Sequence, residues 1–112
     1  MIVAQPFSSE NQAWHKYSDF KLFSAFIPLV DITVDNGCLE VLTDTLKISP
    51  RNYDKHMNKK VQATCTAGSV YAIDGRLIHR GLANQTSISR PVIHVIISTG
   101  NSCINFAKDL KQ

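Results

Sequence analysis

Cysteine is scarce in this 112-residue chain, and long apolar runs are absent. The three cysteines, Cys38, Cys65 and Cys103, are odd in number and widely scattered, which predicts neither a disulfide framework nor a zinc site of closely spaced cysteine pairs. No stretch approaches the roughly 18 apolar residues that span a bilayer, and no basic region precedes an apolar run at the N-terminus. We therefore expect reduced thiols, no membrane partner and a cytoplasmic location.

Two independent cores are excluded by the length of the chain. Hydrophobic residues make up 44% of the sequence and charged residues 19%, which is typical of a folded globular protein and not of a disordered tail. We expect residues 1–112 to form one domain, in which 99–112 is a C-terminal tail with a short helix at 105–111.

A dense basic stripe is also missing. The formal net charge is +3, and part of it comes from one polar stretch that contains Lys47, Arg51, Lys55, Lys59 and Lys60. A nucleic-acid surface needs a denser array of basic residues on one element, so a solvated loop is the preferred interpretation. A basic nucleic-acid-binding β domain is the least favoured function, and no nucleic-acid partner is expected.

What the sequence does contain is a series of short apolar segments rich in Val, Ile and Phe, which predict strands. The clearest are 22–30, 39–42, 69–73 and 91–98. Asn36-Gly37 tolerates the positive φ angles of a tight turn and predicts a hairpin between the first two. The segment 43–60 is predicted to be a long loop with about one helical turn. Several short strands without an internal repeat indicate a sandwich or barrel.

Four segments carry a functional signal when they are taken in order. They are Trp14-His15, then Asp31-Ile32-Thr33 with Asn36-Gly37-Cys38-Leu39, then Gly75-Arg76-Leu77-Ile78-His79-Arg80-Gly81, and finally Arg90-Pro91. At these distances they resemble the phytanoyl-CoA dioxygenase family of non-haem iron oxygenases, over about residues 6–98. The resemblance implies a mainly β double-stranded β-helix, a jelly-roll or cupin-like barrel, that is truncated because family members are usually longer.

The resemblance also implies a site. In that family an early His-x-Asp and a distant His hold Fe(II), and a later Arg binds the far carboxylate of 2-oxoglutarate; the pattern maps onto His15, His79 and Arg90. Two imidazoles and one carboxylate on one face of iron leave positions open for 2-oxoglutarate and O₂, and a planar guanidinium suits a carboxylate. The implied function is an Fe(II)- and 2-oxoglutarate-dependent dioxygenase that hydroxylates a small organic substrate. Strand alternation places Arg90 on the same face as Val92 and His94.

One position departs from the family pattern. Tyr17 stands where the family has its iron-binding aspartate, and a phenol with a pKa of about 10 is a poor ligand for ferrous iron. Asp19 is the candidate replacement, but it lies about 6.6 Å further along an extended strand and needs a bulge or turn to reach the metal. A catalytically impaired pseudoenzyme or small-molecule binding module is therefore the main competing hypothesis.

Several side chains have more than one role that fits the sequence. Arg90 could pair with Asp74 or Asp31 at a strand end, and Trp14 and Phe26 could each be ordinary core or part of a pocket wall. His56 and His94 are interpreted as a solvated and a packed side chain, outside the site. Self-association into a homodimer could cover exposed barrel edges.

Overall fold

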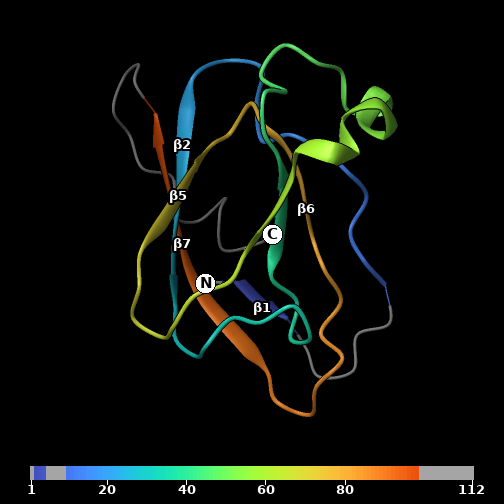
Figure 1. Ribbon diagram of the computed structural model, residues 1–112. Coiled ribbons are helices and arrows are strands. Elements are labelled where there is room, and N and C mark those ends of the chain that lie inside the picture. The colour runs from blue at the N-terminus through green and yellow to red at the C-terminus, as the bar shows by residue number, and fades with distance from the viewer. Residues whose placement is uncertain (1, 5–9, 99–112) are drawn as a thin grey trace.

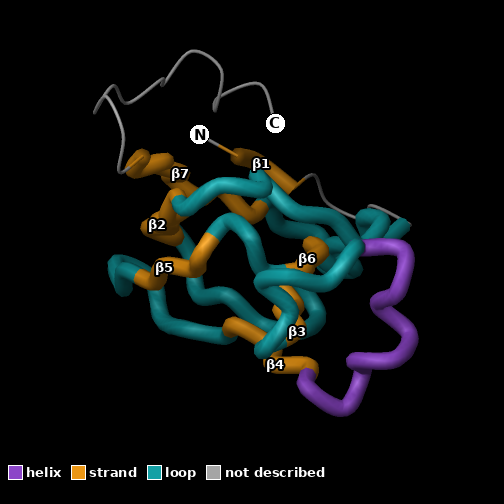
Figure 2. Tube along the Cα trace, turned by 90° about the horizontal axis from the view of Figure 1, so that it is seen from above, coloured by secondary structure: helices purple, strands orange, loops and turns teal. Residues whose placement is uncertain are grey.

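Two antiparallel β-sheets face each other in the computed structural model, which describes residues 2–4 and 10–98 (Figure 1). The predicted tail at 99–112 and its helix lie outside the described residues. Seen from above, β7, β2 and β5 lie on one side and β6, β3 and β4 on the other (Figure 2). The mainly β prediction is confirmed.

The larger sheet has four strands in the order β1 (Ile2–Ala4), β7 (Arg90–Ser98), β2 (Leu22–Pro28) and β5 (Tyr71–Asp74). Alternate residues of β2 are buried, as expected for strands with one face on the core.

The smaller sheet has the order β4 (Lys60–Ala63), β3 (Leu39–Leu42) and β6 (Ile78–Gly81). Residues 12–17 run along the open edge of β6. His15 and His79 exchange two backbone hydrogen bonds of 2.9 Å, and the N–H of Gln12 donates to the carbonyl of Gly81 at 2.9 Å. This segment therefore extends the sheet and fixes His15 beside His79.

The core between the sheets contains Phe26, Ile32, Cys38 and Val92, all nearly inaccessible to solvent. Outside the smaller sheet lies a 3-10 helix, η1 (Pro50–Lys59), which is interrupted at Asn52 and buries none of its residues. It appears in purple beyond β3 and β4 in Figure 2. The sequence predicted only one helical turn here, because apolar residues are sparse in this segment and Pro50, Asn52 and Asn58 interrupt any period.

The predicted hairpin at Asn36-Gly37 is wrong. A turn does form, with Gly37 at φ 98°, but β2 pairs with β5 and β7 while β3 pairs with β4 and β6. The Asn36 side chain accepts from the N–H of Thr33 and donates to the carbonyl of Asp31, so the turn closes on itself and carries the chain from one sheet to the other. The glycine is required, because a Cβ at position 37 would lie 2.6 Å from the carbonyl oxygen of Leu82.

Candidate metal centre and its pocket

A cavity of about 430 Å³ opens between the two sheets. Its wall combines His15 and Tyr17 from the edge segment, Phe26 and Tyr71 from β2 and β5, and Arg90 from the start of β7. Residues far apart in the sequence thus meet at one cavity, and two of the predicted site residues, His15 and Arg90, line it.

The imidazole rings of His15 and His79 lie side by side, with centres 4.4 Å apart. His15 Nδ1 is 2.7 Å from the carbonyl of Ala13, and His79 Nδ1 is 2.9 Å from the carbonyl of Leu77. Because a carbonyl only accepts, each Nδ1 carries the proton and each Nε2 presents a lone pair. This is the arrangement that metal-binding histidines commonly adopt.

The His79 ring is fully buried, and no hydrogen bond within the described part of the chain satisfies its Nε2. Burial lowers the pKa of His79 to about 4, so the ring is neutral near pH 7. A buried nitrogen without a partner costs roughly 1–3 kcal/mol. A metal ion bound at Nε2 would remove that cost.

Tyr17 lies against the ring of His79. Its ring centre is 4.4 Å from that of His79, and Tyr17 lines the cavity whereas His79 does not. Within residues 2–4 and 10–98, no group of three or more His, Cys, Asp or Glu side chains is placed to hold a metal ion. Asp19 is exposed, and the structure does not bring it into such a group with His15 and His79. The two imidazoles fit a divalent metal, and the position of the third ligand does not.

Arg90 projects into another part of the cavity, where its Nε donates to the carbonyl of Asn36 at 3.1 Å. It forms no ion pair with a described carboxylate. Asp74 pairs with Arg76 at 2.7 Å, and Asp31 accepts from the N–H of Ala67 at 2.8 Å. Burial lowers the pKa of Arg90 from its usual range, but a guanidinium stays charged near pH 7. Arg90 is therefore a half-buried cation whose charge is available to an anionic ligand.

Stacked rings form the wall of the cavity between the histidine pair and Arg90. Tyr71 stacks on Phe26 at 4.9 Å, Phe26 on His94 at 4.5 Å, and His94 lies 5.3 Å from Tyr17. Burial raises the pKa of Tyr71 to about 12, so its hydroxyl keeps its proton. Tyr71 was missed from the sequence because the apolar run that contains it did not reveal which residues face inward.

The opposite face of β6 carries a charge network. Glu40 is 2% exposed and accepts from Arg80 Nε at 2.9 Å and from Gln62 at 3.0 Å, and it also pairs with Lys60 at 3.4 Å. The Arg80 guanidinium lies 4.4 Å from the ring centre of Trp14. Trp14 is thus part of this outer face and not of the core between the sheets.

Two facing antiparallel sheets around a pocket with paired histidines and an arginine define a double-stranded β-helix of the cupin-like class. A model of the phytanoyl-CoA dioxygenase (PhyH) family matches residues 3–92, and the chain belongs to this family. No curated protein sequence matches the chain.

Solved structures share the fold. AviO1 from Streptomyces viridochromogenes Tue57 is 19% identical over 91% of this chain and 49% of its own, with a TM-score of 0.77. EvdO2 from Micromonospora carbonacea var. aurantiaca, complexed with 2-oxoglutarate, is 18% identical over 84% of this chain and 47% of its own, with a TM-score of 0.68. ThoJ, a non-heme monooxygenase in a nickel complex, is 16% identical over 85% of this chain and 40% of its own, with a TM-score of 0.70.

These likenesses confirm the predicted double-stranded β-helix. The chain spans half or less of the length of each of these structures. In the part of the chain that the structure describes, no helix is long and apolar enough to cross a membrane.

Proposed function

We propose that this chain is the barrel of an Fe(II)- and 2-oxoglutarate-dependent oxygenase that acts on a small organic molecule. His15 and His79 hold the metal through Nε2, and Arg90 binds the far carboxylate of 2-oxoglutarate. The observation that carries the proposal is the buried, unsatisfied Nε2 of His79 beside the His15 ring. Membership of the family, the 2-oxoglutarate bound to EvdO2 and the nickel bound to ThoJ support it.

Each residue has a definite task in this proposal. The carbonyls of Ala13 and Leu77 hold the two imidazoles in the tautomer that leaves Nε2 free, and the low pKa of His79 keeps its lone pair available above about pH 5. Arg90 attracts a carboxylate because no described acid neutralises it, and the protonated Tyr71 adds an O–H donor to the same cavity. Iron, when bound, would supply the oxidising chemistry.

A second function is favoured by Tyr17. A phenol in place of the family's aspartate would supply one metal bond and one negative charge fewer, and Tyr17 lines the cavity whereas the neighbouring His79 does not. In this second function the chain binds 2-oxoglutarate or another small anion at Arg90 but catalyses no reaction.

Melting temperatures measured with Ni(II) and 2-oxoglutarate distinguish the oxygenase from the binding module, because a ligand that binds only the folded state stabilises it. The oxygenase proposal expects the two ligands together to raise the melting temperature. His79→Leu should abolish the metal-dependent part and Arg90→Met the part due to 2-oxoglutarate, whereas the control His56→Leu, on η1, should change neither.

A binding module would be stabilised by 2-oxoglutarate to the same extent with and without metal. A metal-dependent rise that survives His79→Leu would refute the proposed site. If the metal-dependent rise is present, consumption of 2-oxoglutarate under air with Fe(II) then tests turnover.

A further inference from the structure

Two further hollows adjoin the central pocket along residues 12–19. One, of about 320 Å³, is lined by Gln12 and Trp14 together with Arg51 and Tyr53 of η1. The other, of about 350 Å³, is lined by Trp14 and Lys16. The first hollow shares Gln12 with the central pocket, the second shares Lys16 with it, and Trp14 lines both hollows; we refer to the three together as the groove.

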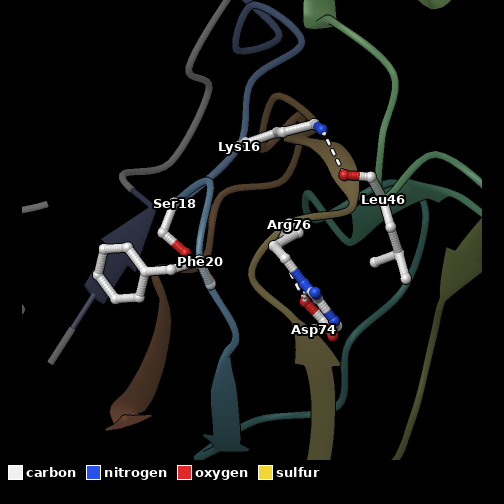
Figure 3. A network of polar contacts seen from close by, with 6 residues as sticks. All are labelled: Lys16, Ser18, Phe20, Leu46, Asp74 and Arg76. Carbon is white, nitrogen blue, oxygen red and sulfur yellow. Dashed lines mark hydrogen bonds and ion pairs between the residues drawn. The ribbon is translucent and has the colours of Figure 1, made fainter. Parts of the chain in front are cut away.

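Positive charge lies along this groove. The Lys16 ammonium donates to the carbonyl of Leu46 at 3.0 Å, which holds it at the pocket rim (Figure 3). Neither Lys16 nor Arg51 forms an ion pair with a carboxylate of the described residues. Arg80 also lines the groove, but Glu40 at 2.8 Å neutralises it.

Negative charge is nearly absent from the same walls. The central pocket has no acidic residue in its lining, and the adjoining hollows have only the exposed Asp19. Low-dielectric walls with one dominant sign of charge concentrate ions of the opposite sign. The groove is therefore suited to a negatively charged ligand in addition to the one at Arg90.

The groove also has an apolar wall. Trp14 and Tyr53 stack with ring centres 5.8 Å apart, and Pro50 lines the hollows on both sides of Trp14. Flat side chains with apolar faces favour contact with the hydrocarbon part of a ligand.

We propose that the groove binds an organic acid, whose apolar body lies beside Trp14 and whose carboxylate pairs with Lys16 at the rim. Arg51 adds attraction without direct contact. The inference that the organic acid is the substrate rests on the proposed function. The binding site itself does not depend on iron.

Trp14 is the single tryptophan of the chain, so its indole N–H gives one unambiguous NMR signal that reports on the groove. We would titrate metal-free, ¹⁵N-labelled protein with hexanoate and with hexanamide at constant ionic strength. Hexanoate should shift the Trp14 signal saturably, with a Kd lower than that of the uncharged amide by roughly fivefold.

Matched variants test which basic side chain binds the carboxylate of hexanoate. Lys16→Met should raise the Kd for hexanoate roughly fivefold, and Lys16→Arg should restore it, because the lost contact is a single partly solvated ion pair. Arg51→Gln should have a smaller effect. Lys55 also lies on η1 but lines none of the three hollows. Lys55→Gln removes the same charge and should leave the Kd for hexanoate unchanged.

Equal affinity for the amide, or no effect of Lys16→Met, would overturn the inference. So would complete displacement of hexanoate by saturating 2-oxoglutarate, because hexanoate would then have been bound at Arg90. If 2-oxoglutarate itself does not bind while Lys16-dependent hexanoate binding persists, the proposed function fails and the organic-acid site stands.

Discussion

The two faces of the smaller sheet differ in how fully their buried polar groups are hydrogen-bonded. On the outer face, Glu40 is buried but accepts hydrogen bonds from Arg80 and Gln62 and pairs with Lys60. Burial alone would raise the pKa of Glu40, and these partners bring it below its usual value. On the inner face, one residue before Arg80, His79 is buried with one ring nitrogen unsatisfied. The paired charges on the outer face stabilise the fold, whereas the unsatisfied nitrogen of His79 on the inner face does not.

The largest effect is expected on the outer face. Glu40→Ala should lower the free energy of unfolding by about 3 kcal/mol, because it leaves Arg80 and Lys60 without their shared partner. Urea denaturation measures this loss. A cost below about 0.5 kcal/mol, as for a surface pair, would remove the distinction between the faces.

Acid should destabilise the metal-free protein through the inner face. The pKa of His79 is about 4 in the folded state and 6.5 in the unfolded chain, so between these values the unfolded chain binds a proton that the folded state does not. Stability is therefore full above pH 6.5 and falls as the pH decreases, by about 2 kcal/mol from pH 7.5 to 5. The slope of stability against pH in this window should decrease in His79→Leu, and an unchanged slope would contradict the assignment.

Removal of the unsatisfied group itself should cost little. His79→Leu should change the free energy of unfolding of the metal-free protein by less than about 1 kcal/mol at pH 7.5, because the unsatisfied Nε2 is lost along with the bond to Leu77. Denaturation of this variant beside Glu40→Ala compares the two faces directly. A loss as large as that of Glu40→Ala would show that His79 is structural.

The smallest effect is expected at the pair of Asp74 and Arg76, away from both faces (Figure 3). The hydrogen bond from Arg76 lowers the pKa of Asp74, but both side chains retain contact with water. Asp74→Asn should therefore cost about 0.5 kcal/mol, measured by the same denaturation. A cost above about 2 kcal/mol would mean that this half-buried pair matters as much as the buried network around Glu40.

The sequence predicted the inward face of β7 well. Alternation from Arg90 placed Val92 and His94 on one side, and both are buried there. The resemblance to the family implied that His15 would lie near His79, and the structure places the two ring centres 4.4 Å apart. The face of β7 follows from strand period, a local property of the sequence, whereas the proximity of His15 and His79 came only from the family resemblance.

Features that depend on pairing between distant segments were not accessible. The Asn36-Gly37 turn gave a correct local signal, but only the pairing of β2 with β7 shows that it connects two sheets. Glu40 and Arg80 are 40 positions apart, and neither residue alone indicates a buried pair. The position of the Tyr17 ring, 4.4 Å from that of His79, likewise depends on the register of residues 12–17 against β6.

The most direct test of the central claim, a two-imidazole metal site limited by Tyr17, is anaerobic calorimetry of Fe(II) with 2-oxoglutarate present. Tyr17→Asp should bind Fe(II) at least about tenfold more tightly than the native chain, because it adds a charged ligand and uncovers His79. Tyr17→Asn, which uncovers His79 without the charge, should lie between them. Equally tight binding by the native chain and Tyr17→Asp would contradict the claim and show that another group completes the site, and no binding by any of the three would show that His15 and His79 do not form a metal site.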